Sequence, residues 1–84
     1  MILVYPNPST GYLTVECLNK TSGNVKFEVF DMAGKMVFKK FENGLLNSAG
    51  SYQLDLHNLI SGSYILEVRH VTDVNRVKFI LFKN

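Results

Sequence analysis

Apolar and polar residues alternate along most of the chain with a period of two residues, which is typical of β-strands. The clearest example lies at residues 64–69, where Tyr64, Leu66 and Val68 fall on one face of an extended chain. Ile65 adds an apolar residue to the other face, as expected for a strand that is covered on both sides. This stretch is therefore predicted to be the central strand of the fold.

Six further stretches show strand patterns and are separated by polar, glycine-containing or proline-containing segments. They are residues 2–5, 12–18, 25–30, 35–41, 51–56 and 76–82. No window has the 3.6-residue apolar period of a helix over a helical length. Seven short strands at regular spacing predict an all-β fold, a two-sheet antiparallel sandwich.

The inward-facing positions of these strands define a predicted core. Its members are Leu13, Val15, Phe27, Val29, Leu54, Leu56, Tyr64, Leu66, Val68, Val77 and Phe79. In the strand at 35–41, Met36 and Phe38 are predicted to share one face, with Val37 on the other. Leu45 and Leu46, in the loop that follows, are predicted to cap the core.

Two connecting segments carry specific turn signals. Residues 6–11 contain two prolines and Gly11, which exclude a helix and predict a rigid bend. Asp31, followed three residues later by Gly34, predicts a hairpin with a type I turn closed by a left-handed glycine. Two adjacent lysines follow this turn, Lys39 and Lys40, and they suggest an edge strand that discourages further strand addition.

The segment before the central strand resembles the corner of a β-sandwich, in which a tyrosine just inside a strand bonds back to the preceding loop. Leu59, Gly62 and Tyr64 occupy its positions. Gly62 is expected to allow a tight turn without a Cβ clash. The alternative is that Tyr64 is only an aromatic residue of the strand.

Composition limits the classes of function. The 84 residues allow one domain, with 46% hydrophobic and 19% charged residues, as in an ordinary folded chain. The net charge of +2 is too small to indicate nucleic-acid binding. Cys17 is the single cysteine, predicted to be a buried small hydrophobic residue. No apolar run reaches transmembrane length, and the start lacks secretory-signal features. The proline-rich entry near residue 1 suggests a domain excised from a longer protein.

Candidate chemistry is scarce. Gly34-Lys35 lacks the rest of a phosphate loop, and His57 and His70 have no partners at metal-ligand spacing. The serines lack a nucleophile-elbow context. Three tyrosines would form a sugar-stacking platform if exposed together, although local packing is the favoured alternative; they are Tyr5, Tyr12 and Tyr52. The expectation is a non-catalytic module without a metal or cofactor.

Four ordered motifs resemble those of a known family. They are YPNPSTGYLTV at residues 5–15, VFDMAGKMV at 29–37, LDLHNLISGSYIL at 54–66, and a basic end at Lys83. In this order and spacing they are similar to the type A C-terminal sorting domain of type IX secretion system cargo from the Bacteroidota. The resemblance covers nearly the whole chain.

The resemblance implies a seven-stranded immunoglobulin-like sandwich at the end of a longer secreted protein. It implies that the outer-membrane translocon reads the domain as an address, that a sortase-like signal peptidase removes it, and that the passenger is attached to the cell surface. The positions that match the family motifs are Pro6, Asn7, Pro8, Gly11, Gly34, Lys35, Leu59, Gly62, Tyr64 and Lys83. Asn84 departs from the pattern, because many members end at the basic residue.

Two functions remain open. One is the sorting signal, with transit through the periplasm to the surface or medium. The other is a non-catalytic cell-surface binding sandwich of the carbohydrate-binding or fibronectin type III kind. For the sorting signal, residues 79–84 are the predicted docking element, because apolar side chains including Phe82 occupy both faces of this strand end beside a basic tip. The alternative is that this strand is central and covered on both sides.

Overall fold

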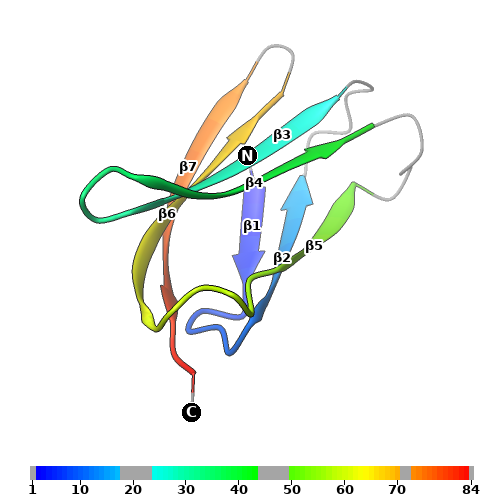
Figure 1. The fold of residues 1–84 in the computed structure, drawn as a ribbon. Helices are drawn as coiled ribbons and strands as arrows, with labels where there is room; N and C mark the ends of the chain where they lie inside the picture. The colour runs from blue at the N-terminus through cyan, green and yellow to red at the C-terminus, as the bar shows by residue number, and fades with distance from the viewer. Residues whose placement is uncertain (1, 18–23, 44–49, 71–72, 84) are drawn as a thin grey trace.

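The computed structural model describes residues 2–17, 24–43, 50–70 and 73–83, and the predicted cap of Leu45 and Leu46 lies outside them. The described residues form seven β-strands, in agreement with the prediction (Figure 1). The strands are β1 (Ile2–Tyr5), β2 (Tyr12–Cys17), β3 (Val25–Asp31), β4 (Met36–Glu42), β5 (Ser51–Asp55), β6 (Gly62–Arg69) and β7 (Val74–Leu81).

The strands pair into two antiparallel sheets that face each other as a sandwich (Figure 1). Sheet A has the order β1-β2-β5, and sheet B has the order β4-β3-β6-β7. β6 lies inside sheet B, between β3 and β7, so the prediction of a central strand is confirmed. β4 is an edge strand, as its two adjacent lysines indicated, and β7 forms the opposite edge.

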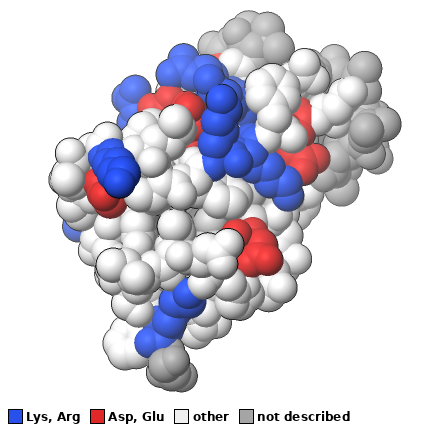
Figure 2. All heavy atoms as spheres, in the orientation of Figure 1, with Lys and Arg blue, Asp and Glu red and all other residues white. Residues whose placement is uncertain are grey.

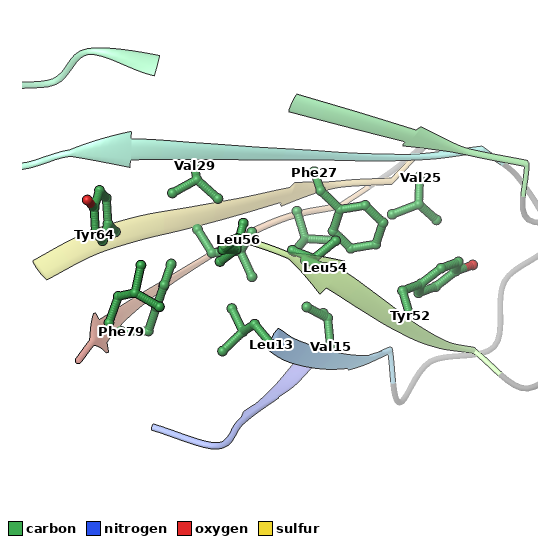
Figure 3. Packing of buried hydrophobic residues seen from close by; sticks show 13 residues of the cluster. Leu13, Val15, Val25, Phe27, Val29, Tyr52, Leu54, Leu56, Tyr64 and Phe79 are labelled. Carbon is green, nitrogen blue, oxygen red and sulfur yellow. The ribbon is translucent and has the colours of Figure 1, made fainter. Parts of the chain in front are cut away.

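The core lies between the sheets and is built from alternate residues of five strands and the segment after β5 (Figure 3). It contains every predicted core residue except Val77, together with Val25, Tyr52 and Leu81. The prediction for Val77 was wrong, since its side chain is only half-buried. Val77 of β7 pairs with Leu66, whereas Phe79 and Leu81 of the same strand, which lie nearer to the entry bend of residues 6–11, are buried.

A β-bulge changes the faces predicted for β4. The pairing of β3 with β4 shifts between Val29 and Phe30, so that Val29 lies opposite Phe38 while Phe30 lies opposite Met36. One extra residue in β4, Val37, breaks the alternation at this point. Val37 and Phe38 both contact the core, whereas Met36 is exposed, so the prediction that Met36 and Phe38 share a face was wrong.

The hairpin turn between β3 and β4 has the predicted form. Asp31 Oδ1 accepts hydrogen bonds from the backbone N–H of Ala33 (3.0 Å) and Lys35 (2.9 Å). The N–H of Gly34 donates to the Asp31 carbonyl at 3.0 Å, and Gly34 has a φ of 86°. A residue with a Cβ is strained at that angle, which explains the glycine.

Candidate functional site

The segments that carry the sequence motifs meet at one end of the sandwich, here called the motif end. β1, β3, β5 and β7 finish there, and β2, β4 and β6 begin there. The motif end comprises residues 6–11, 31–35, 56–62 and 82–83 (Figure 1). Stretches more than 70 residues apart in sequence therefore become neighbours.

The entry segment runs along the outer edge of β7. The Asn7 side chain accepts a hydrogen bond from the N–H of Ile80 (2.9 Å) and donates to the Lys78 carbonyl (3.4 Å). The Ser9 N–H donates to the Ile80 carbonyl, and the Phe82 N–H donates to the Ser9 carbonyl, both at 2.8 Å. Asn7 and Ser9 thus satisfy the edge groups of β7 from Lys78 to Phe82, which an edge strand otherwise leaves unpaired.

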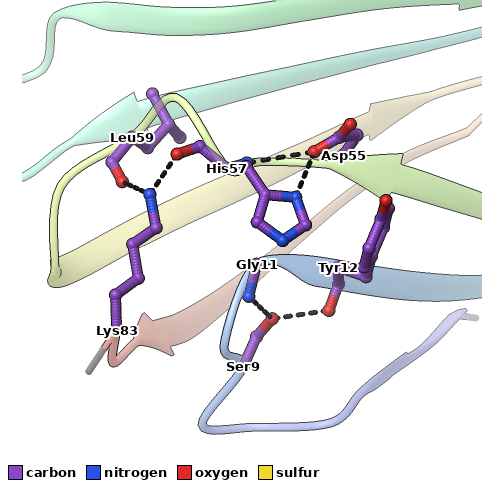
Figure 4. Close-up of polar contacts among 7 residues, drawn as sticks. All are labelled: Ser9, Gly11, Tyr12, Asp55, His57, Leu59 and Lys83. Carbon is purple, nitrogen blue, oxygen red and sulfur yellow. Dashed lines mark hydrogen bonds and ion pairs between the residues drawn. The ribbon is translucent and has the colours of Figure 1, made fainter.

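Ser9 is fully buried and fixes the bend that leads into β2 (Figure 4). Its Oγ donates to the Tyr12 carbonyl at 2.5 Å and accepts from the Gly11 N–H at 3.2 Å. Sequence analysis did not select Ser9. The available signal was a small hydroxyl residue directly after Pro8, a type that commonly bonds to the backbone of a nearby turn.

Gly11 is required by close contact. A Cβ built there would lie 2.4 Å from the Nε2 atom of His57, and the φ of Gly11 is 152°. The His57 ring is held in place by Asp55, whose Oδ1 lies 2.6 Å from His57 Nδ1 and accepts the His57 N–H at 3.1 Å. The edge of this ring also contacts Tyr12, with ring centroids 4.5 Å apart. The hydrogen bonds that Asp55 makes with the ring and the backbone N–H of His57 lower the pKa of the Asp55 carboxyl.

Lys83 ties the end of the chain to the loop before β6 (Figure 4). Its ammonium group donates to the carbonyl of His57 and, at 2.7 Å, to that of Leu59. Its backbone N–H donates to Ser61 Oγ at 2.9 Å. Leu59 is half-buried against the core. The basic residue of the chain end therefore closes the loop that carries the corner motif.

The corner itself has the predicted geometry. Tyr64 is 5% exposed, its hydroxyl donates to the Ile60 carbonyl at 2.6 Å, and its ring stacks on Phe79 with centroids 5.7 Å apart. The alternative, in which Tyr64 is only a strand aromatic, is excluded by this hydrogen bond across four residues. Tyr64 joins the loop to the core.

The sequence matches the family described as "Secretion system C-terminal sorting domain" over residues 3–82. The chain belongs to this family of sorting domains. The resemblance to type IX secretion C-terminal domains is thereby confirmed.

A solved structure supports the fold of the sorting domain. This chain superimposes with a TM-score of 0.70 on the crystal structure of a DUF3244 family protein from Bacteroides vulgatus. That protein is described as having an immunoglobulin-like β-sandwich fold. The match covers 99% of this chain and 84% of that chain at 17% identity. The immunoglobulin-like sandwich is therefore confirmed. No match was found among curated protein sequences.

The motif residues of the sorting domain are connected in two ways. Contacts join the entry segment, the corner loop and Lys83, as described above. The hairpin motif at residues 29–37 is joined to the corner motif by strand pairing, because Val29, Phe30 and Asp31 of β3 lie opposite Leu66, Ile65 and Tyr64 of β6. Pro6, Pro8 and Lys35 are exposed.

The reason expected for Gly62 was wrong. A Cβ at Gly62 would lie 3.7 Å from the nearest atom of the Tyr64 ring, an ordinary contact, and Gly62 does not have a positive φ. The bend before β6 is instead held by the hydrogen bonds of Tyr64 and Lys83 to the loop carbonyls. Gly62 is exposed, so its backbone is accessible at the start of β6.

The three tyrosines do not form a common platform. Tyr52 is 6% exposed and belongs to the core, whereas Tyr5 and Tyr12 lie on the outer face of sheet A. The Tyr5 hydroxyl donates to the Glu16 carboxylate, and this bond raises the pKa of Tyr5. The structure therefore contradicts a sugar-stacking platform of all three tyrosines, because Tyr52 is buried.

The structure also bears on metal ligands and on the thiol of Cys17 in the described ranges. No group of three or more His, Cys, Asp or Glu residues in this part of the chain could hold a metal ion. Cys17 is half-buried against the core, and burial raises the pKa of its thiol. In the described residues, no helix is long and apolar enough to span a membrane.

Loss of the Tyr64 hydroxyl should destabilise the corner. The Tyr64→Phe variant leaves the Ile60 carbonyl without its partner in a part-buried position, so the free energy of unfolding should fall by about 1–3 kcal/mol. Urea denaturation measures this change. A midpoint equal to that of the wild type would contradict the role of the hydroxyl.

Glu67 is a buried carboxylate that sequence analysis did not select. It is 7% exposed and accepts hydrogen bonds from Arg76 Nε (2.9 Å) and an Arg69 guanidinium nitrogen (2.7 Å). These bonds lower the pKa of Glu67 despite its burial. The sequence signal for this ion pair was a glutamate between two apolar core residues, with an arginine two positions later.

The lowered pKa of Glu67 predicts a loss of stability in acid. Unfolding restores the ordinary pKa, so the stabilisation is complete above about pH 4.3, and it is lost as the pH falls through the folded pKa. Glu67→Gln removes this proton linkage. Its melting temperature should fall less than that of the wild type between neutral pH and strong acid. Parallel pH curves for the two proteins would show that Glu67 makes no such contribution.

Proposed function

We propose that this domain is a secretion address, recognised in its folded state by the type IX machinery of the outer membrane. It directs export of a passenger protein joined to its N-terminus. The whole chain, residues 1–84, acts as a single C-terminal sorting domain of a longer secreted protein. The domain passes through the periplasm with its passenger, which then reaches the cell surface or the medium.

The match to the sorting-domain family across residues 3–82 carries this proposal. The geometry of the motif end supports it. Asn7 and Ser9 hold the beginning of the domain against β7, and Lys83 holds its end against the loop before β6, so the motif segments take these positions only in the folded sandwich. A receptor that reads this end would therefore accept a folded domain and reject an unfolded chain.

The domain contributes no catalysis in this proposal and needs no cofactor. A sortase-like signal peptidase removes it after export and leaves the passenger attached to the surface of a Bacteroidota cell. The exposed candidates for contact with these partners are Pro6, Pro8, Gly34, Lys35, Gly62 and Phe82. Asn7, Gly11, Leu59, Tyr64 and Lys83 act by holding the motif end together.

Export of a reporter tests the function. A periplasmic reporter with an N-terminal export signal is fused to residues 1–84 and expressed in a Bacteroidota host with an intact type IX system. The reporter should appear at the surface or in the medium. It should remain in the periplasm when the translocon is deleted, and also when the domain is omitted. Equal export with and without the domain would disprove the sorting function.

A further inference from the structure

The outer face of sheet B is divided into a charged half and an apolar half. Away from the motif end, a row of charged residues crosses all four strands, namely Lys39, Glu28, Glu67 and Arg76. Phe41 and Val74 are exposed still further along, but Lys26 and Arg69 separate them. Figure 2 shows most of the charged side chains over the upper part of the molecule and few towards the C-terminus.

In the next row towards the motif end, the residues on β4, β3 and β6 are apolar, and the residue on β7 is Lys78. Phe30 lies opposite both Met36 and Ile65, since the β-bulge turns Met36 to the outer face. Ile80 follows on the same face of β7. Phe82 comes two residues later, directly beyond the strand, and is exposed. These five residues are called the apolar patch. Met36, Ile80 and Phe82 are 45%, 43% and 60% exposed.

The patch lies beside a strand edge that is already closed. Asn7 and Ser9 occupy the backbone groups of β7 next to Ile80 and Phe82. A partner therefore cannot add a strand to this part of β7 without displacing the entry segment. The side chains of the patch remain available to a partner on the face of the sheet.

Three lysines surround the patch. Lys35 precedes Met36, Lys39 lies in the adjacent row, and Lys78 pairs with Ile65. None of them forms an ion pair within the described ranges. This charge disfavours a second copy of the chain, which would bring lysines against lysines. It also falls short of the cluster of about 4–8 basic residues that holds a protein on an anionic membrane.

We propose that the apolar patch is the docking surface of the domain for the secretion machinery. The complementary site on the machinery is a protein surface with an apolar centre and carboxylates around it, which face Lys35, Lys39 and Lys78. This inference rests on the proposed function. In this account the outer face of sheet B is recognised by the machinery. The entry segment and Lys83 have a structural role, because their hydrogen bonds keep that face in its folded conformation.

A matched pair of substitutions in β7 tests the patch. Ile80 and Val74 are both β-branched, lie on the same outer face and are 43% and 44% exposed, but only Ile80 belongs to the patch. With the reporter fusion, Ile80→Asp should reduce export at least about tenfold, as expected for a central anchor of an interface. Val74→Asp should leave export unchanged.

Folding and charge are measured on the same fusions. The purified Ile80→Asp and Val74→Asp domains should melt at similar temperatures, which separates recognition from stability. Lys78→Glu should reduce export, and Lys78→Gln should reduce it less, because the partner is acidic. Unchanged export of Ile80→Asp while the wild-type domain supports export would overturn the patch and leave the sorting function intact. Failure of the wild-type fusion to export would overturn both.

The other possible occupants give distinct results. Sedimentation of the purified domain with phosphatidylglycerol vesicles, abolished by Ile80→Asp, would assign the patch to lipid and overturn the proposal. Dimerisation in analytical ultracentrifugation that Ile80→Asp removes would assign it to a second copy. The expected result is a monomer that does not sediment with the vesicles.

Discussion

Replacing Leu66 with alanine should lower the free energy of unfolding by about 2–5 kcal/mol, since it removes a buried side chain and leaves a cavity. Leu66 is fully buried in the middle of β6, the interior strand that pairs with both β3 and β7. Its register neighbours are Val29 and Val77. A domain of this size has a total stability of about 5–10 kcal/mol, so this one substitution removes much of it.

Leu3→Ala is the matched control, because it deletes the same atoms from an edge strand where the side chain is 44% exposed. Its expected cost is about 1 kcal/mol or less, as for other surface substitutions. Urea denaturation of both variants gives the comparison. Equal losses at Leu3 and Leu66 would contradict the placement of the core between the sheets.

Deleting residues 82–84 should keep the passenger in the periplasm. The deletion removes the Phe82 N–H that bonds to Ser9, and it removes Lys83, which holds the His57 and Leu59 carbonyls. It also removes one member of the apolar patch. Export of the reporter should fall at least about tenfold, the scale expected when a central anchor of an interface is lost.

Removal of Asn84 alone is the control and should leave export unchanged. Lys83→Met, which keeps an apolar stem without the ammonium group, should reduce the melting temperature by freeing the loop before β6. Full export after deletion of residues 82–84 would show that the end of the chain has no part in recognition.

The sequence predicted the strands because its alternation has a clear period of two wherever one face is buried. The turns were also predictable, since Asp31 and Gly34 act through local backbone geometry. Met36 and Val77 were misplaced for non-local reasons. The bulge in β4 depends on pairing with β3, and Val77 is less covered than Phe79 and Leu81 of the same strand, which lie beside the entry segment. Neither relation can be read from a local pattern.

The site was predicted only as a set of separate motifs. Asn7 and Lys83 were selected by resemblance, but their partners lie on other strands and loops, so their structural roles required the fold. Ser9 was missed because its burial results from contact with β7. Gly62, in contrast, was selected from the sequence, but the backbone role expected for it was wrong. The apolar patch depends on the bulge at Met36 and could not be recognised without it.

The central claim is that the folded domain, and not its terminal sequence alone, is the secretion address. It is tested most directly by comparing export of one reporter fused to residues 1–84 with export of the same reporter fused to residues 50–84. The shorter fusion keeps the corner motif and the basic end but lacks β1 to β4 and the entry segment. The account predicts export of the first fusion and retention of the second in the periplasm. Equal export of the two fusions would contradict it.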